Sequence, residues 1–403
     1  MEFFKNPNIN WMGRKWYFIA LSLLLTLAGM VSLLAKGGPR YGIDFRGGVL
    51  VQVKFKETPD LERLRAALRS QGIANSTLQQ FGPESDNELL IGLDLQGAQE
   101  GELGTGQQAI LRALRTEFGA GDGQNWNEAS EATIAQLLES EAVPGLPPEQ
   151  IQSLAERLVQ FRDAPPQNGL VGKFEDLNQV AGVTPQVLQT LRGNFSMSPF
   201  AVRNVEVVGP KVGAELRHKA VLATLLGLAS VLIYVALRFE WIYGVAAILA
   251  IFHDVIITVG FLSIANMEVT LTVIAALLTL VGYSVNDTIV VFDRIRENVR
   301  LMRRASITEI ADCSINQTLS RTVLTSGLTF SSVLALFLFG GEALRGFSFT
   351  LVVGILVGTY SSISVASTIV VCWQEYANRH RVSRAVRGLD KPQKDRLKVG
   401  ARV

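Results

Sequence analysis

The fold class is decided by residues 269–292, which read VTLTVIAALLTLVGYSVNDTIVVF. Almost every side chain in this stretch is apolar or small, and Asp287 is its only acidic or basic residue. A transmembrane helix needs about 20 mostly apolar residues to cross the hydrocarbon core of a bilayer. Residues 269–292 therefore predict a membrane-spanning helix.

Five other stretches of the 403-residue chain have the same character. Only 18% of the residues are charged, against about 25% in typical soluble proteins. This composition excludes a disordered, collagen-like or coiled-coil chain, and a mean hydropathy of +0.26 favours a membrane bundle with one sizeable aqueous domain. The six predicted spans are residues 16–35, 220–237, 242–265, 269–292, 322–339 and 347–373.

The charges are unevenly distributed along the chain. Residues 38–215 hold 15 basic and 23 acidic residues, a net −8, so the remainder must carry +10 to reach the total of +2. Most of that excess lies in short segments that six spans place on one side, which the positive-inside rule makes the cytoplasm. We therefore predict a cytoplasmic N-terminus (1–15), a first span (16–35), an extracytoplasmic head (38–215), five spans (220–373) with a cytoplasmic segment at about 293–320, and a basic cytoplasmic tail (374–403).

The head is predicted to be an α+β domain. Strand patterns occur at residues 49–55, 77–81, 88–93 and 202–208, and amphipathic helical patterns at 61–70 and 109–118. The resulting order, β-α-β-β-α-β, is the split βαβ pattern of ferredoxin-like domains. Residues 119–200, between the second helix and the last strand, are predicted to be a helical insertion of unassigned role.

The motifs of covalent and nucleotide chemistry are absent from the sequence. It contains no G-x-x-x-x-G-K-[ST] loop, no H-E-x-x-H and no C-x-x-C, and its three histidines are scattered. We therefore expect no enzymatic activity, no cofactor, no metal site, no catalytic residue, and no nucleotide or nucleic-acid ligand. This argues against an ATP-driven pump or a metalloprotease.

Ionisable residues within the predicted spans are candidates for function, because charge in a bilayer is costly. Asp287 lies in the fourth span, and Arg321 begins the fifth on the cytoplasmic side. Low dielectric favours the neutral form of a carboxylate, whereas an approaching arginine favours its charged form. Such a pair can take up and release a proton as helices shift; the alternative is a fixed salt bridge, or an arginine that snorkels to water.

Four more polar residues accompany this pair. Asp254 follows His253 near the middle of the third span, where the two can carry protons or simply complete an internal hydrogen-bond network. Tyr283 and Asn286, close to Asp287, can line the same path or serve only helix packing. We take Asp287, Arg321 and Asp254 as candidate proton-coupling residues, with the other three in support.

Two motifs resemble the SecD/SecF family of protein-export membrane proteins, and in particular its SecF branch, which is related to the RND transporters. One is GIDFRGG at residues 42–48, with Gly42, Asp44, Gly47 and Gly48; the other is GYSVNDTIVVFDRIRE at residues 282–297. His253-Asp254 and NQTLSRT at residues 316–322 also fit the family pattern. Asp44 is more simply explained as a hydrogen-bond acceptor in a glycine-rich turn than as a substrate contact.

The resemblance implies an accessory subunit of the Sec preprotein translocase in a bacterial inner membrane. Members act with SecD and the SecYEG channel, and use the proton motive force to promote late translocation of a preprotein. The aspartate and arginine tied to proton passage correspond to Asp287 and Arg321. Six spans are half of an RND unit, so SecD is expected as a partner, alongside membrane lipid; the long head departs from the usual family pattern.

Two other interpretations remain open. The chain can be half of an RND-like, proton-driven exporter of a small molecule or lipid, which would require a substrate pocket. It can also be a structural scaffold of the translocase in which Asp287 and Arg321 serve only packing.

Overall fold

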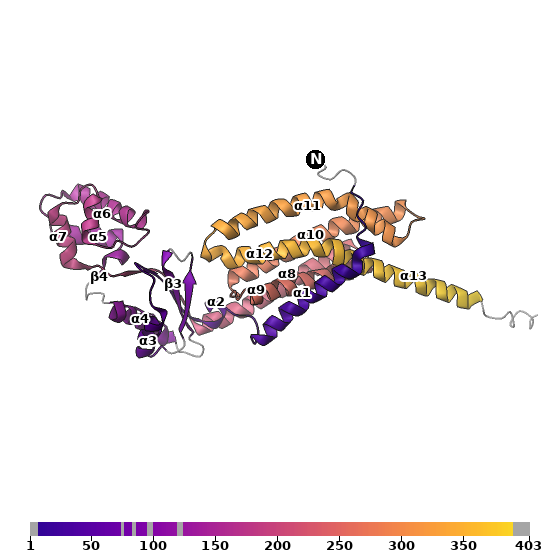
Figure 1. Ribbon diagram of the computed structural model, residues 1–403, viewed down its shortest axis with the longest axis horizontal. Helices are drawn as coiled ribbons and strands as arrows, with labels where there is room; N and C mark the ends of the chain where they lie inside the picture. Colours follow the sequence, from indigo (N-terminus) through magenta and orange to yellow (C-terminus); the bar gives the residue numbers. More distant parts are fainter. Residues whose placement is uncertain (1–6, 74–75, 83–85, 95–99, 119–123, 390–403) are drawn as a thin grey trace, which may run out of the picture. The chain divides into compact units, whose positions relative to one another are not determined.

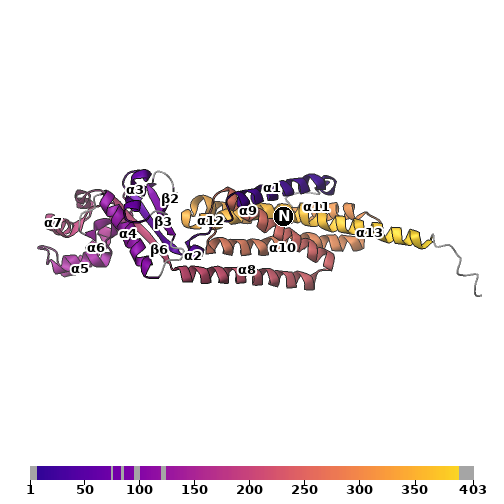
Figure 2. The same ribbon diagram turned by 90° about the horizontal axis from the view of Figure 1, so that it is seen from below.

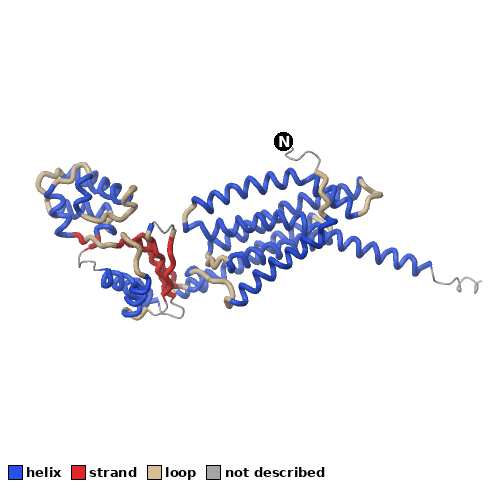
Figure 3. Tube along the Cα trace, in the orientation of Figure 1, coloured by secondary structure: helices blue, strands red, loops and turns tan. Residues whose placement is uncertain are grey.

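The computed structural model describes residues 7–73, 76–82, 86–94, 100–118 and 124–389 (Figure 1). The chain divides into two compact units. We call Met1–Arg40 with Lys219–Val403 the helical unit, and Tyr41–His218 the head. Among the described residues, all strands belong to the head, as the colouring of Figure 3 shows.

The helical unit contains the long apolar helices. Within the described residues, six helical stretches are long and apolar enough to cross a membrane, as the sequence predicts. They are formed by α1 (Lys15–Ala35), which a short turn η1 (Met12–Arg14) precedes, α8 (Pro210–Arg238), α9 (Trp241–Ile264), α10 (Leu271–Leu301), α11 (Ile307–Phe339), and α12 (Glu342–Ser361) continued by η5 (Ser362–Ala366) and α13 (Ser367–Leu389).

The helices differ in how deeply they lie in the bundle. In α9, α10 and the α12–α13 stretch, half or more of the residues in the most apolar part are buried, whereas in α1, α8 and α11 only 11% are. Figures 1 and 2 show α12 beside α10 and α1 beside α9. The inner helices therefore form the core of the bundle, and the outer ones present apolar surface.

Small residues bring the central helices close together. A Cβ atom added at Gly260 of α9 would lie 2.6 Å from the Cα atom of Gly29 in α1, closer than real Cβ contacts. On α12, a Cβ added at Gly354 would lie 2.6 Å from a methyl group of Leu280 on α10. Close helix approach at small residues is the usual way that membrane helices gain packing energy.

Helix α11 begins earlier than its predicted span at residues 322–339. It starts at Ile307 because Ser306 and Glu309 form a capping box: the Ser306 hydroxyl accepts from the Glu309 amide, and the Glu309 carboxylate accepts from the Ser306 amide. The helix thus extends well beyond its apolar part, and this extension contacts the chain segment before α1.

The head contains a four-stranded sheet with every neighbouring pair antiparallel. The strands β1 (Gly48–Phe55), β2 (Ser76–Phe81), β3 (Glu88–Asp94) and β6 (Phe200–Val208) lie in the order β2-β3-β1-β6. Helices α3 (Leu61–Ser70) and α4 (Glu100–Phe118) contribute Leu64, Leu68, Ile110 and Leu114 to a core shared with alternate residues of β1. The predicted helix at 109–118 therefore begins nine residues earlier.

A second group of elements in the head has its own apolar core around the fully buried Trp126 (Figure 1). It comprises the pair β4 (Gln124–Asn125) and β5 (Phe195–Ser196), the short turns η3 (Trp126–Glu128) and η4 (Phe174–Gln179), and the helices α5 (Glu131–Ser140), α6 (Pro148–Asp163) and α7 (Pro185–Asn194). These elements lie between α4 and β6 in the sequence.

Candidate functional site: two buried carboxylates in the helical bundle

Asp287 lies on the buried face of α10, with 2% of its surface exposed. Its Oδ2 atom accepts a hydrogen bond of 2.8 Å from the Ser326 hydroxyl on α11. An ionised carboxylate can only accept hydrogen bonds, whereas a protonated one can also donate. The contact between α10 and α11 at this point therefore responds to the protonation of Asp287.

Arg321 lies on α11 five residues before Ser326, and its side chain is exposed. Both it and Asp287 are described residues, and no ion pair within 4.0 Å joins them, although the guanidinium is near enough to interact electrostatically with the carboxylate. The structure brings the two predicted residues onto packed neighbouring helices without a salt bridge. The fixed-bridge arrangement is thus not the one observed.

Asp254, on α9, is the second buried carboxylate and is 1% exposed. Its Oδ2 accepts hydrogen bonds from the Ser284 hydroxyl on α10 at 2.5 Å and the Ser361 hydroxyl on α12 at 2.8 Å. Its Oδ1 lies 2.9 Å from Nδ1 of His253. Asp254 therefore connects three helices through polar contacts inside an apolar bundle, where each unmade hydrogen bond would be costly.

The two carboxylates are connected through α10. Ser284 and Asp287 are three residues apart, so they lie on the same face of the helix. One residue further, the Thr288 hydroxyl forms a 2.9 Å hydrogen bond with the Ser362 hydroxyl. A continuous polar strip along α10 thus faces α9, α11 and the start of η5.

The strip meets an irregular part of the last span. Segment η5, residues Ser362–Ala366, is a π-helix, a form that occurs mostly as single turns inside α-helices and is frequent at functional sites. Just before it, a Cβ atom added at Gly358 would lie 3.3 Å from Cβ of Ser284 and 3.7 Å from Oδ2 of Asp254. Gly358 therefore leaves the space in which Ser284, Ser361 and Asp254 meet.

The supporting residues differ in their surroundings. Among the described residues, the Tyr283 hydroxyl and Nε2 of His253 are buried without a hydrogen-bond partner. Asn286 is exposed on the outer surface of α10 and does not join the buried strip.

The glycine motif at residues 42–48 shapes the start of the head's sheet. Gly42 precedes a short helix α2 (Ile43–Arg46), which contains Asp44. Gly47 has φ +75°, and an added Cβ would lie 2.7 Å from Cα of Pro210. Gly48 allows the Leu93 carbonyl to approach within 2.3 Å of where its Cβ would be. The motif therefore has a packing role in this structure.

Sequence reasoning identified the two carboxylates but missed the hydroxyl groups that surround them, Ser284, Ser326, Ser361, Ser362 and Thr288. Within the described ranges, no group of three or more His, Cys, Asp or Glu side chains is arranged to hold a metal ion. The chemistry available in the site is the binding and release of protons by carboxylates whose hydrogen-bond donors come from other helices.

Six described helices that are long and apolar enough to cross a membrane, with carboxylates buried between them, are typical of a polytopic membrane protein. Residues 188–376 match the family model "Protein export membrane protein SecD/SecF, C-terminal", and residues 32–59 match the "SecD/SecF GG Motif". Protein translocase subunit SecF of Koribacter versatilis is 46% identical, with all of both chains covered. The subunit of the same name from Calditerrivibrio nitroreducens is 38% identical over 92% of this chain and 96% of its own. The chain belongs to the SecF family of protein translocase subunits.

The solved structures agree with this assignment. The crystal structure of SecDF from Thermus thermophilus, described as a translocon-associated membrane protein, is similar at a TM-score of 0.61 and 34% identity. The match covers 92% of this chain but only 39% of that SecDF chain. The predicted family and its translocase-subunit role are thereby confirmed.

Proposed function

We propose that this subunit uses proton movement through its bundle to promote preprotein translocation, together with a SecD partner and the SecYEG channel. The observation that carries the proposal is the placement of Asp287 and Asp254 at contacts between different helices, each held by hydroxyl groups. A proton that binds at either carboxylate changes the hydrogen bonds between helices, and not only those within one.

The energy that one proton supplies is similar in size to the energy of the hydrogen bonds it would change. One elementary charge that moves through 100 mV of membrane potential supplies about 2.3 kcal/mol. A buried hydrogen bond that is left unmade costs about 1–3 kcal/mol, and more where a charged group is involved. A single proton is therefore sufficient to favour one packing of α10 and α11 over another.

Arg321 has the role of a movable counter-charge in this proposal. It is exposed and not paired with Asp287 in the observed arrangement, so a small shift of α11 can bring the two together. Contact with the arginine would favour the ionised carboxylate and so promote proton release. The exposed position of Arg321 on an outer helix also suits a surface that a partner's helices cover.

The topology follows from the charge distribution. We propose that both termini and the segment at about 293–320 are cytoplasmic, and that the head is extracytoplasmic, in a bacterial inner membrane. The strand order β2-β3-β1-β6 supports a ferredoxin-like classification of the head, with residues 119–200 as its helical insertion. The partial coverage of the longer SecDF chain supports a separate SecD partner.

The test is preprotein translocation into vesicles that contain the channel and both subunits, measured with and without a proton gradient. Asp287→Asn is expected to lose the gradient-dependent part of translocation and keep the rest. Asp293→Asn is the matched control, because it makes the same change six residues later, where the side chain is exposed. Equal stimulation of both variants by the gradient would mean that Asp287 has only a packing role.

A further inference from the structure

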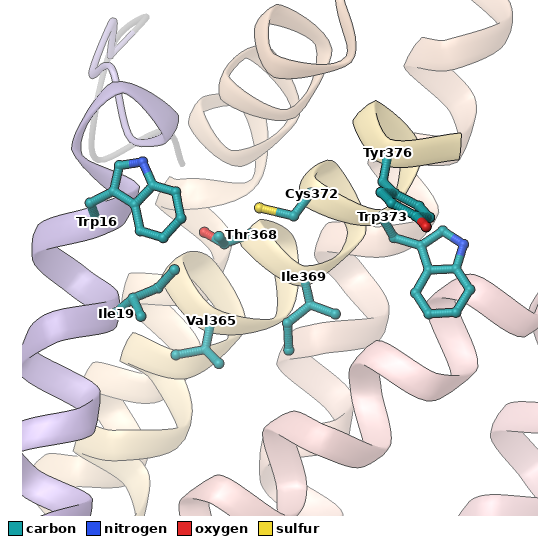
Figure 4. Close-up of a pocket in the computed structure, with 8 residues that line it drawn as sticks. All are labelled: Trp16, Ile19, Val365, Thr368, Ile369, Cys372, Trp373 and Tyr376. Carbon is teal, nitrogen blue, oxygen red and sulfur yellow. The ribbon is translucent and has the colours of Figure 1, made fainter. Parts of the chain in front are cut away.

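An open apolar groove lies between the start of α1 and the last helical stretch (Figure 4). Its volume is about 600 Å³, within the range of ligand pockets. Trp16 and Ile19 of α1 form one wall, and Ile369, Cys372 and Tyr376 of α13 form the other.

The lining of the groove suits a hydrocarbon chain. The Thr368 hydroxyl in its wall already donates to the Ser364 carbonyl of the same helical stretch, so it needs no external partner. An α-helix is about 10 Å across with a 5.4 Å pitch, so a space of about 600 Å³ holds little more than one helical turn. The dimensions therefore favour a slender chain over the helix of a partner protein.

The aromatic residues place this groove at the membrane surface. Trp16, Trp373 and Tyr376 are each more than half exposed although all three border the groove. Tryptophan and tyrosine are enriched at the level of lipid headgroups, where their rings meet both water and hydrocarbon. A lipid bound here would thus have its headgroup beside these rings and its acyl chain between the helices.

Positive charge gathers at the same end of the groove. Ile369, Cys372, Tyr376 and Arg379 follow one another on α13 at intervals of three or four, so Arg379 continues the lining face and is exposed. Exposed Arg14 ends η1, two residues before Trp16 of α1. The acidic Glu375 is already held by Lys15 at 3.5 Å and by the Thr308 hydroxyl at 3.1 Å. Among the described side chains near the groove, the charges left without a partner are therefore basic.

We propose that this groove is a binding site for an anionic phospholipid, with an acyl chain between Ile19 and Ile369 and the headgroup beside Arg14 and Arg379. This site is separate from the buried carboxylates, so the proposal stands independently of proton coupling.

Cys372 provides a direct readout, since it is a half-buried free cysteine in the groove wall. The full chain, purified in detergent, is mixed with micelles that contain either dioleoyl phosphatidylglycerol or dioleoyl phosphatidylcholine. The rate of Cys372 alkylation by N-ethylmaleimide is followed by mass spectrometry. Cys313, a second half-buried free cysteine outside the groove, is the internal reference in the same sample.

Phosphatidylglycerol is expected to slow the alkylation of Cys372 relative to Cys313 more than phosphatidylcholine does. Arg379→Gln should reduce this preference about fivefold, the effect of one basic residue near an anionic lipid surface. Ile19→Trp, which fills the groove, should protect Cys372 without lipid and remove the effect of either lipid.

Three results would overturn the proposal. Equal protection by the two lipids would mean that the groove is only solvated by hydrocarbon. Protection in lipid-free micelles would mean that another part of this chain or a second copy already occupies the groove. No protection by phosphatidylglycerol would mean that the groove holds no lipid chain near Cys372.

Discussion

The Ser326 hydroxyl of α11 donates a 2.8 Å hydrogen bond to the buried Asp287 carboxylate of α10. Other serines of the same helix, such as Ser331, donate instead to a carbonyl oxygen four residues earlier in their own helix. Ser326 thus uses its hydroxyl to join two helices. The hydrogen bond therefore connects the buried carboxylate to α11, the helix that also contains Arg321.

The first prediction concerns Ser326→Ala. This change leaves one oxygen of a buried carboxylate without its donor, so the free energy of unfolding should fall by about 1–3 kcal/mol. Gradient-dependent translocation should fall as well. Ser332→Ala is the control, because Ser332 is exposed and bonds within its own helix; it should change stability by less than about 0.5 kcal/mol. Equal thermal unfolding of the two variants in detergent would contradict the assigned role.

The second prediction concerns Asp254 and its two hydroxyl donors. Ser284→Ala and Ser361→Ala each remove one of the bonds to Oδ2, and each should destabilise the bundle by about 1–3 kcal/mol. The two serines share one acceptor atom. The loss of unfolding free energy in the double variant should therefore differ from the sum of the two single losses by at least about 0.5 kcal/mol. A double-mutant cycle on thermal unfolding measures this coupling.

A second pair of serines provides the control for this cycle. Ser230 on α8 is exposed and donates to its own helix, so Ser230→Ala combined with Ser284→Ala should be additive. If the pair at Asp254 is also additive, the two hydroxyls do not share the carboxylate in solution.

The contrast between Asp287 and Ser326 shows how far the sequence could predict the site. A lone acidic residue in an apolar span is conspicuous, because its burial needs a reason. Serine and threonine in membrane helices usually satisfy their hydroxyls within the helix, so their presence carries little information. Nothing local distinguishes Ser326 from Ser331; only the packing of α10 against α11 makes one of them a ligand of the carboxylate.

The positions of the main helices and strands were predictable from the sequence, but some helix ends and helix contacts were not. Apolar runs are sufficient to locate six spans, and period-two alternation locates the main strands of the head. The extension of α11 back to Ile307 lies in polar sequence, so hydropathy misses it, although the Ser306 and Glu309 cap signals it. The close packing of α1 against α9 depends on two glycines, Gly29 and Gly260, which are far apart in the sequence and so cannot be paired from it.

The third prediction tests the close packing of α1 against α9. Gly260→Ala places a methyl group 2.6 Å from Cα of Gly29, so α1 must move away from α9. The overpacking should cost about 1–3 kcal/mol and lower the midpoint of thermal unfolding. Gly282→Ala on α10 is the matched control, because an added Cβ there meets nothing within 4 Å. It should leave the midpoint unchanged or raise it slightly, since alanine favours helix.

The last prediction concerns the glycine motif of the head. Gly48→Ala would put a Cβ atom 2.3 Å from the Leu93 carbonyl oxygen, where β1 pairs with β3. Gly47→Ala is strained for two reasons, the φ of +75° and the 2.7 Å approach to Cα of Pro210. Each variant should lower the free energy of unfolding of the head by about 1–3 kcal/mol. Limited proteolysis of the full chain measures this as faster cleavage within residues 41–218.

Gly104→Ala is the control for both changes, because it lies in helix α4 with open space around its added Cβ. It should slow cleavage of the head or leave it unchanged, since alanine stabilises a helix relative to glycine by up to about 1 kcal/mol. Gly47 and Gly48 variants as resistant as Gly104→Ala would argue against a packing role and return the motif to candidate functional status. Because a Cβ atom at either glycine would collide with backbone atoms, we expect no second substitution within the head's core to restore resistance.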